Sequence, residues 1–179
     1  MLFALGTGCS SGSNTGGDGA PATGPSESIA PAEVQSPAPE GFRAATLTIH
    51  TADGRTVTRC VLVADSEALR EQGLMGVTDE NLSGYDGMLF VFDADTTGGF
   101  WMKSTLIPLS IAFADDAGSV VSTADMVPCP AGTDRCPITE AAGPYRYAVE
   151  VTSGGLPAVG LVDGAALDPT FGPACQRST

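Results

Sequence analysis

Residues 44–64 have the sequence AATLTIHTADGRTVTRCVLVA, and this stretch decides the fold. Apolar and polar residues alternate on either side of Asp53-Gly54, a dipeptide that is a strong short signal for a hairpin turn. Leu47 and Ile49 share one face of the first strand, because side chains two residues apart point the same way. The stretch therefore predicts a β-hairpin over roughly residues 44–64.

Short strands and turns continue along the rest of the chain. Ser66 or Asp65 can cap a short helix that ends near Gln72, before Gly73. Residues 87–92, GMLFVF, are apolar on both faces and belong in the middle of a sheet. Further strands are expected at 100–103, 106–114, 119–127 and 145–152, with a loop at 93–99 and a small helical turn and strand within 155–171. The pattern predicts a mostly β (α+β) fold, a compact antiparallel β-barrel-like domain with one short helix.

The N-terminal part of the chain differs from the rest in composition. Residues 1–8 are a short apolar fragment that runs into Cys9, which is similar to the end of a bacterial lipoprotein signal. The leucine that usually stands three places before such a cysteine is Gly6 here, and no basic region precedes the fragment. Residues 10–42 are rich in Gly, Ser, Pro and Ala and contain no Lys or Arg. This composition predicts disorder, because the segment could bury little apolar surface.

These features predict three parts. Residues 1–9 are expected to be a residual lipoprotein signal with its lipidation cysteine, residues 10–42 a disordered tether, and residues 43–176 the β-rich domain. We therefore expect the membrane as a partner, through a lipid anchor at Cys9. The expected location is extracytoplasmic, on the outer face of the bacterial cell membrane. The alternative is that Cys9 is a chance cysteine in a disordered tail.

The 179 residues carry a net charge of −13. Such an acidic surface repels both nucleic-acid phosphates and anionic bilayers, so we expect no nucleic acid as a partner and no membrane binding through a basic patch. His50 is the single histidine, which excludes a zinc site built from several histidines. We predict no metal, no cofactor and a monomer.

Five cysteines are present, and setting Cys9 aside leaves an even number, which suits an oxidising compartment. Cys129 and Cys136 lie seven residues apart, a comfortable separation for a disulfide and not the spacing of a zinc or redox motif. Cys60 and Cys175 could form a second disulfide. The alternative is that each of these two is a free thiol.

Three ordered blocks of sequence carry a family resemblance: GLMG at 73–76, GMLFVF at 87–92 and FWMKSTLIPLSI at 100–111. With these blocks the chain resembles the domain-of-unknown-function family 192 over roughly residues 46–168. The resemblance implies a small β-rich fold that is often exported. It implies no activity and carries over no catalytic residue.

Two positions depart from the family pattern. The family usually has asparagine where Ser104 stands and aspartate where Ser110 stands. These departures weaken any claim that an amide or a carboxylate is chemically required at either place.

The single tryptophan and the single lysine of the chain lie two residues apart. Trp101 and Met102 belong either to the core or to the wall of a binding pocket. Lys103 must reach water or a carboxylate, because an unpaired buried charge is costly, and Asp65 and Glu150 are candidate partners. A structural ion pair, ligand recognition and catalysis all remain open for this lysine.

Three functions follow from these residues. The first is an uncharacterised exported, lipid-anchored domain that binds a small molecule or a cell-envelope component, with carbohydrate as one class, since an aromatic face beside polar groups suits sugars. The second is a hydrolase or transferase that uses Lys103 with Thr105 or Ser104. The third is a purely structural protein-interaction module. We favour binding over catalysis, and the candidate ligand-binding residues are Trp101, Met102, Lys103, Thr105, Asp65 and Glu150.

Overall fold

The computed structural model describes residues 41–130, 135–168 and 170–175. All of them belong to the compact unit Val34–Thr179. The expected lipoprotein signal, Cys9 and the expected tether up to residue 40 lie outside the described residues.

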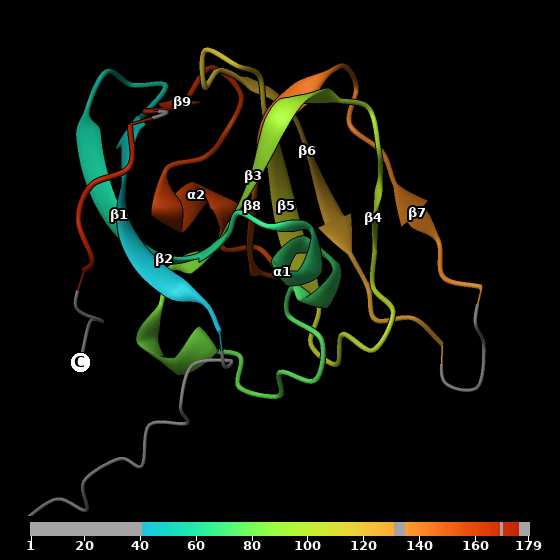
Figure 1. Ribbon diagram of the computed structural model, residues 1–179. Helices are drawn as coiled ribbons and strands as arrows, with labels where there is room; N and C mark the ends of the chain where they lie inside the picture. Colours follow the sequence, from blue (N-terminus) through green and yellow to red (C-terminus); the bar gives the residue numbers. More distant parts are fainter. Residues whose placement is uncertain (1–40, 131–134, 169, 176–179) are drawn as a thin grey trace, which may run out of the picture. The chain divides into compact units, whose positions relative to one another are not determined.

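The described residues form short strands, two short α-helices and one 3₁₀ turn (Figure 1). In chain order these are β1 (Arg43–His50), β2 (Thr56–Ala64), α1 (Glu67–Gln72), η1 (Leu82–Gly84), β3 (Gly87–Thr96), β4 (Phe100–Trp101), β5 (Leu109–Ala114), β6 (Val120–Met126), β7 (Ile138–Thr139), β8 (Tyr145–Thr152), α2 (Leu156–Val159) and β9 (Ala166–Leu167).

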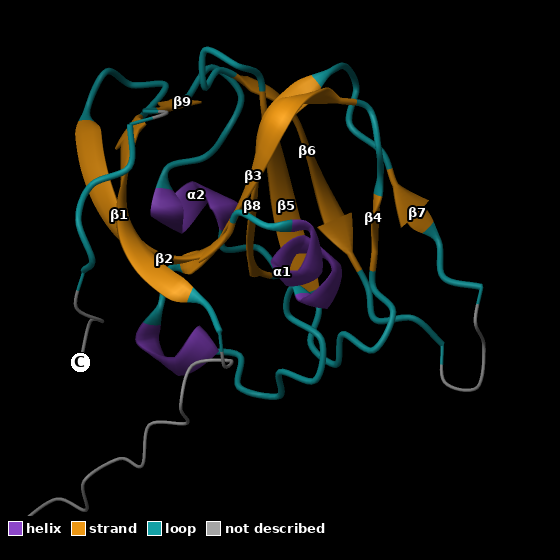
Figure 2. Ribbon diagram, viewed as in Figure 1, coloured by secondary structure: helices purple, strands orange, loops and turns teal. Residues whose placement is uncertain are grey.

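Seven strands form one sheet in the order β6-β5-β8-β3-β2-β1-β9, while β4 and β7 form a separate pair. Neighbouring strands are antiparallel except β2 and β3, which are parallel. The sheet curls into a half-barrel (Figure 2), and its edges meet at one end, where Ser119 and Ala166 form an isolated bridge. The predicted mostly β, barrel-like fold class is confirmed.

The predicted hairpin is present. β1 and β2 pair antiparallel along the whole length of β1. In the turn, the Thr51 N–H donates to the Arg55 carbonyl at 2.8 Å, and Gly54 has a φ of 83°, in the left-handed region that glycine enters without steric cost.

The strands predicted around residues 100–114 are shorter than expected. β4 ends at Trp101, and β5 begins only at Leu109. The segment between them contains Ser104, whose φ of 56° is left-handed, and Pro108, which lacks the N–H that a ladder requires. The Trp-Met-Lys motif therefore lies at a strand end and in a turn.

Two other boundaries differ from the sequence-based expectation. β3 runs on to Thr96, through part of the predicted loop at 93–99. α2 adds a second short helix to the one named in the predicted fold class, at the place where the sequence indicates a helical turn.

The sheet separates two apolar clusters. Side chains alternate along β8, so Ala148 and Glu150 share one face while Val149 lies on the other. In the sheet register Glu150 stands between Met88 of β3 and Ile111 of β5. Both of these neighbours belong to the first apolar cluster, so the fold places a carboxyl group among apolar side chains.

The predicted Cys129–Cys136 disulfide is present, and Cys60 and Cys175 form a second one. The Cα atoms are 5.2 Å apart in Cys129–Cys136 and 5.6 Å apart in Cys60–Cys175. The pairing of Cys60 with Cys175, which the sequence left open, joins β2 to the C-terminal segment across 115 residues.

Candidate functional site

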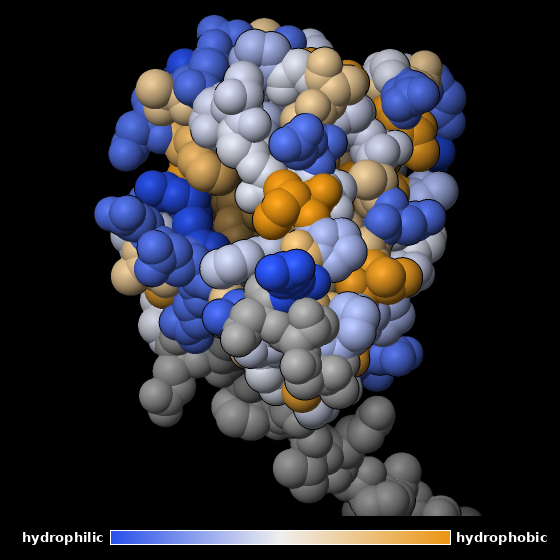
Figure 3. Space-filling model, turned by 90° about the vertical axis from the view of Figure 1, so that its right-hand side faces the viewer, coloured by the Kyte–Doolittle hydropathy of each residue, from blue (hydrophilic) through white to orange (hydrophobic). Residues whose placement is uncertain are grey.

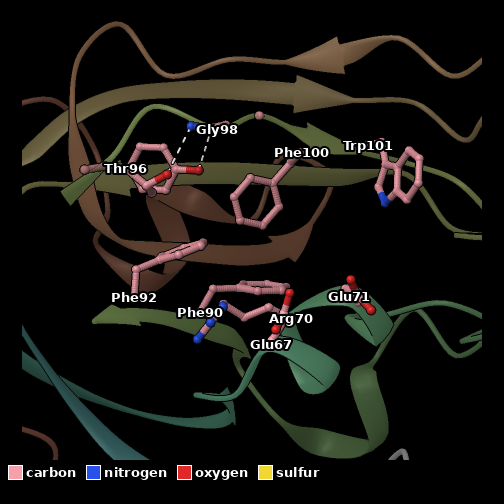
Figure 4. A pocket seen from close by; sticks show the side chains of 11 residues that line it. Glu67, Arg70, Glu71, Phe90, Phe92, Thr96, Gly98, Phe100 and Trp101 are labelled. Carbon is pink, nitrogen blue, oxygen red and sulfur yellow. Dashed lines mark hydrogen bonds between the residues drawn. The ribbon is translucent and has the colours of Figure 1, made fainter. Parts of the chain in front are cut away.

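A cleft of about 360 Å³ opens between α1 and β4 (Figure 4). Its lining is aromatic on the side of the strands and charged on the side of α1. The aromatic residues that line it are Phe90, Phe92, Phe100, Trp101 and Tyr145. Aromatic side chains supply much contact area while losing little conformational freedom, so this wall suits a ligand with an apolar or ring-shaped face.

The rings of this wall pack edge to face, which fixes their positions. Ring centroids are 4.9 Å apart for Phe90 and Phe100 and 5.4 Å apart for Phe92 and Tyr145. The Tyr145 hydroxyl donates to the Gly98 carbonyl at 2.6 Å. Burial raises the pKa of this phenol to about 12, so the hydroxyl keeps its proton and ties the loop before β4 to β8.

Trp101 lies at the mouth of the cleft with 47% of its surface exposed. The Lys103 Nζ atom stands 5.6 Å from the centroid of its ring, within cation–π range. The other large hydrophobic side chains that are exposed among the described residues are Leu106, Val127 and Ile138. Figure 3 views the domain from the side of β4 and β7, where apolar residues stand among hydrophilic ones and form no broad patch.

The opposite wall is α1, whose position is set by its caps. The Ser66 hydroxyl accepts from the Leu69 N–H at the start of the helix, and Gly73 ends it with a φ of 46°. The predicted stop at Gly73 is confirmed, and of the two N-cap residues left open by the sequence, Asp65 and Ser66, the structure has Ser66.

One face of α1 points its charges at the cleft (Figure 4). Glu67, Arg70 and Glu71 are three and four residues apart and therefore share a helix face. Arg70 is held in place, because its Nη1 donates to the Val91 carbonyl at 2.8 Å and its guanidinium lies 5.0 Å from the centroid of Phe92. Two carboxylates and one fixed guanidinium thus line this wall.

A narrow cavity of about 30 Å³ adjoins the cleft. Glu150 and Thr105 line it, although they do not line the cleft itself. The lining residues common to both spaces are Arg70, Glu71, Phe90, Phe100 and Trp101. The narrow cavity is therefore a side extension of the cleft, reaching toward the sheet.

Glu150 is the unusual group in this extension. It is only 5% exposed, and burial raises the pKa of its carboxyl to about 8. No hydrogen bond or ion pair within the described residues involves this carboxyl. Every fully sealed side-chain oxygen or nitrogen of those residues has a partner. The Glu150 oxygens are therefore not fully sealed, in line with the place of Glu150 in the lining of the narrow cavity.

Gly87 allows β8 to approach β3 at this point. A Cβ atom on Gly87 would lie 2.5 Å from the Glu150 carbonyl oxygen, closer than real Cβ atoms come. The glycine that begins β3 therefore helps to fix the depth at which Glu150 sits.

The turn between β4 and β5 is held from two sides. The Gly76 N–H donates to the Ser104 carbonyl at 2.9 Å, and the Cys129 N–H donates to the Met102 carbonyl at 3.4 Å. Cys129 is itself bonded to Cys136 in a short disulfide loop. These contacts hold the short irregular segment that places Thr105 in the lining of the narrow cavity.

The structure brings together three of the residues singled out from the sequence. Trp101 lines both the cleft and the narrow cavity, and Thr105 and Glu150 line the narrow cavity. Met102 is 3% exposed and belongs to the first apolar cluster. Of the two readings left open for the adjacent Trp and Met, Trp101 is thus a pocket wall and Met102 is core.

The remaining sequence candidates lie elsewhere. Lys103 is half-buried and stands over Trp101, and it is not among the residues that line either cavity. Asp65 pairs with Arg43, with Nη2 and Oδ2 2.9 Å apart. Ser104 is exposed in the turn. The geometry therefore does not place Lys103 in the same cavity as Thr105.

Sequence reasoning did not single out the charged face of α1. The signal was present in the spacing of Glu67, Arg70 and Glu71, which predicts a shared face once the helix is accepted. What the sequence lacked was any indication that this face turns toward β4, because that depends on the path of the connection to β3.

A second cleft, of about 450 Å³, lies beside β5, β6 and α2. Ser110 sits there, where the family usually has aspartate. Its hydroxyl donates to Asp125 at 2.5 Å and accepts from the Gly154 N–H at 2.8 Å. These two hydrogen bonds give the Ser110 hydroxyl a structural role, since it links β5 to β6 and to the turn after β8.

The fold and the cleft define a small β half-barrel domain with an aromatic and acidic groove. Within the described segments, no group of three or more His, Cys, Asp or Glu side chains is arranged to hold a metal ion. The chain belongs to the DUF192 family, described as "Uncharacterized ACR", which matches residues 48–169. The family predicted from the three sequence blocks is confirmed.

Solved structures similar to this chain include two bacterial proteins. A candidate transcription regulator from Sinorhizobium meliloti 1021 is 28% identical, with a TM-score of 0.61, and the match covers 71% of this chain and 94% of that one. A protein of unknown function from Novosphingobium aromaticivorans DSM 12444 is 26% identical, also with a TM-score of 0.61, and the match covers 72% and 87%. A comparison with curated proteins finds no match.

Proposed function

We propose that this protein binds a small molecule or a fragment of the cell envelope in the cleft between α1 and β4. The observation that carries the proposal is the exposed indole of Trp101, at the mouth of an aromatic cleft that extends to the buried carboxyl of Glu150. Aromatic faces stack on the apolar faces of sugar rings and carboxyl groups form hydrogen bonds with hydroxyl groups, so carbohydrate is one ligand class that fits.

The binding proposal is better supported than catalysis by Lys103 with Thr105 or Ser104. A lysine-activated nucleophile requires the two side chains to lie within hydrogen-bond reach in one site. Thr105 lines the narrow cavity and Lys103 does not, while Ser104 is exposed in the turn, so neither the cleft nor the narrow cavity contains Lys103 together with one of the two hydroxyls.

We also propose that the domain is exported and is held at the outer face of the membrane by a lipid on Cys9. The two disulfides support an oxidising compartment. Among the helices of the described segments, none has the length and apolarity to cross a membrane. The test is fractionation of cells that express the full chain: the protein should be in the membrane fraction, and Cys9→Ser should release it. Membrane retention of Cys9→Ser would refute the anchor.

Trp101 provides a direct assay of binding, because it is the single tryptophan of the chain. Fractions of a cell-envelope hydrolysate are added to the full-length protein, and the Trp101 emission is recorded. We expect a saturable change in emission with at least one fraction. The absence of a saturable change with any fraction would contradict the proposal.

Retention of envelope fragments on the immobilised protein gives an independent measurement. Trp101→Ala should abolish the retention that mass spectrometry detects, while Val127→Ala, which truncates another exposed apolar side chain away from both cavities, should leave it unchanged. Equal retention by both variants would place the ligand elsewhere.

Two substitutions of Lys103 separate a structural role from a binding role. If Lys103→Met and Lys103→Arg both lower the melting temperature, the ammonium group stabilises the turn. If both variants melt normally and lose retention, Lys103 contacts the ligand beside Trp101.

A further inference from the structure

We propose that the ligand carries a primary ammonium group, which enters the narrow cavity and pairs with the Glu150 carboxylate. The inference rests on the proposed function of the cleft and names the chemical group that the cleft recognises. It follows from the size of the narrow cavity, from the unpaired carboxyl and from the aromatic rings around it.

The size of the cavity limits what can enter it. Its volume of about 30 Å³ exceeds the roughly 10–15 Å³ that one water molecule needs, but it is far too small for a sugar ring. An ammonium group is close to water in size and projects from a flexible carbon chain. The bulkier part of the ligand would then lie in the cleft of about 360 Å³ against Trp101 and Phe100.

The lining of the cavity favours a cation. Phe90, Phe100 and Trp101 line it, and an aromatic ring attracts a cation that lies over its face. Glu150 offers carboxyl oxygens that no described side chain or backbone group engages. The same combination of aromatic rings and a desolvated carboxyl gives a neutral ligand no comparable electrostatic gain.

The other charged groups near Glu150 do not cancel this preference. Glu71 on α1 lines the same cavity and adds negative charge. Arg70 on α1 also lines the cavity and carries the opposing charge, which the charge of Glu71 offsets, and its guanidinium is held at the Val91 carbonyl and the Phe92 ring. Lys103, on the turn after β4, lies beside Trp101 and does not line the cavity.

Binding of an ammonium group must be coupled to release of a proton. Burial raises the pKa of Glu150 to about 8, so near neutral pH its carboxyl is mostly protonated before the ligand arrives. When the cation enters, the Glu150 proton leaves to solvent and a carboxylate–ammonium pair remains. Affinity should therefore increase as pH rises toward 8, by up to about tenfold per pH unit. A neutral ligand that accepts a hydrogen bond from the protonated carboxyl would show the opposite dependence.

The test uses 2-phenylethylamine and 2-phenylethanol, which share a ring and a chain and differ in the ammonium group. Both are titrated into the full-length protein between pH 6 and pH 8, with Trp101 emission and calorimetry in two buffers of different ionisation enthalpy as readouts. We expect saturable binding of the amine, at least tenfold tighter than the alcohol, with release of up to one proton per amine bound near pH 7.

Two variants test whether Glu150 is the carboxyl that binds the amine. Glu150→Gln should weaken amine binding at least tenfold at pH 8 and remove the pH dependence, since a neutral amide cannot form the ion pair. Glu80→Gln makes the same charge change at an exposed site that lines neither cavity, and it should bind the amine as the wild type does. Melting curves of each variant establish that it is folded.

Each outcome decides the inference. Equal binding of amine and alcohol, amine binding that is unaffected in folded Glu150→Gln, or no amine binding at all would overturn it. Retention of envelope fragments, measured separately, decides whether the cleft binds any ligand. Retention without amine recognition would refute this inference and leave the proposed function standing.

Discussion

Replacing Glu150 with glutamine should make the stability of the protein less dependent on pH. Glutamine has nearly the same shape as glutamate but cannot ionise. In the wild type, the carboxyl lies among Met88, Ile111 and the aromatic rings of the first cluster. Ionising it there leaves a charge without a partner, and this cost is absent from the variant.

The magnitude follows from the pKa. Glu150 has a pKa of about 8 in the folded protein and an ordinary value of 4.5. Between these values the folded state binds more protons than the unfolded state, so the free energy of unfolding falls as pH rises. The difference corresponds to about 1.4 kcal/mol per pKa unit, which gives a loss of about 5 kcal/mol in total above pH 8. At pH 5 most of this stability, about 4 kcal/mol, is still present.

The assay is urea unfolding of the wild type and of Glu150→Gln, with disulfides intact, at intervals from pH 5 to pH 9. We expect the free energies of unfolding of the two proteins to differ little at pH 5. As pH rises, the free energy of unfolding of the variant should increase relative to that of the wild type, by several kcal/mol at pH 9. For Glu80→Gln, which removes an exposed carboxylate, the free energy of unfolding should depend on pH as it does in the wild type. A constant difference between Glu150→Gln and the wild type would refute the reasoning, because Glu150 would then titrate like a solvated carboxyl.

Three further predictions concern the framework. Ser104→Asn should raise the free energy of unfolding by up to about 1 kcal/mol in urea melts, because asparagine tolerates the left-handed φ of 56° better than serine does; a decrease would contradict this. Gly87→Ala should lower it by about 1–3 kcal/mol, since the added methyl group meets the Glu150 carbonyl at 2.5 Å, and unchanged stability would refute the close approach. Removing the Cys60–Cys175 disulfide, which spans 115 residues, with a double Cys→Ala variant should cost about 5 kcal/mol; a thermal midpoint equal to that of the wild type would disprove the constraint.

Local patterns predicted much of the fold. The alternation around Asp53-Gly54 predicted the hairpin of β1 and β2, and the capping residues Ser66 and Gly73 predicted α1. These features depend on neighbouring residues alone. The extent of the break between β4 and β5 was harder to predict from the sequence, because it depends on the backbone conformation of Ser104 and on hydrogen bonds from distant parts of the chain.

The candidate site was predicted only in part. Trp101, Thr105 and Glu150 were named from the sequence, and the structure places them around connected spaces. The role expected for Glu150, a partner for Lys103, is not the one the cavity suggests. Glu150 is buried because β8 lies between β3 and β5 in the sheet. The local sequence of β8 does not indicate which face of the strand is covered by other side chains.

The departure at Ser104 also gains a physical meaning. The family usually has asparagine there, and the left-handed backbone of Ser104 is one that asparagine adopts several times more readily than most residues. The preference can thus be explained by conformation, with no chemical role for the amide.

The parallel pairing of β2 and β3 requires a connection that crosses from one end of the sheet to the other. Residues 65–86 make this crossing, and α1 lies within it. One wall of the cleft is therefore built on a segment that takes no part in the sheet. Substitutions on that helix can therefore change the charge and shape of the cleft wall while the pairing of the half-barrel strands stays intact.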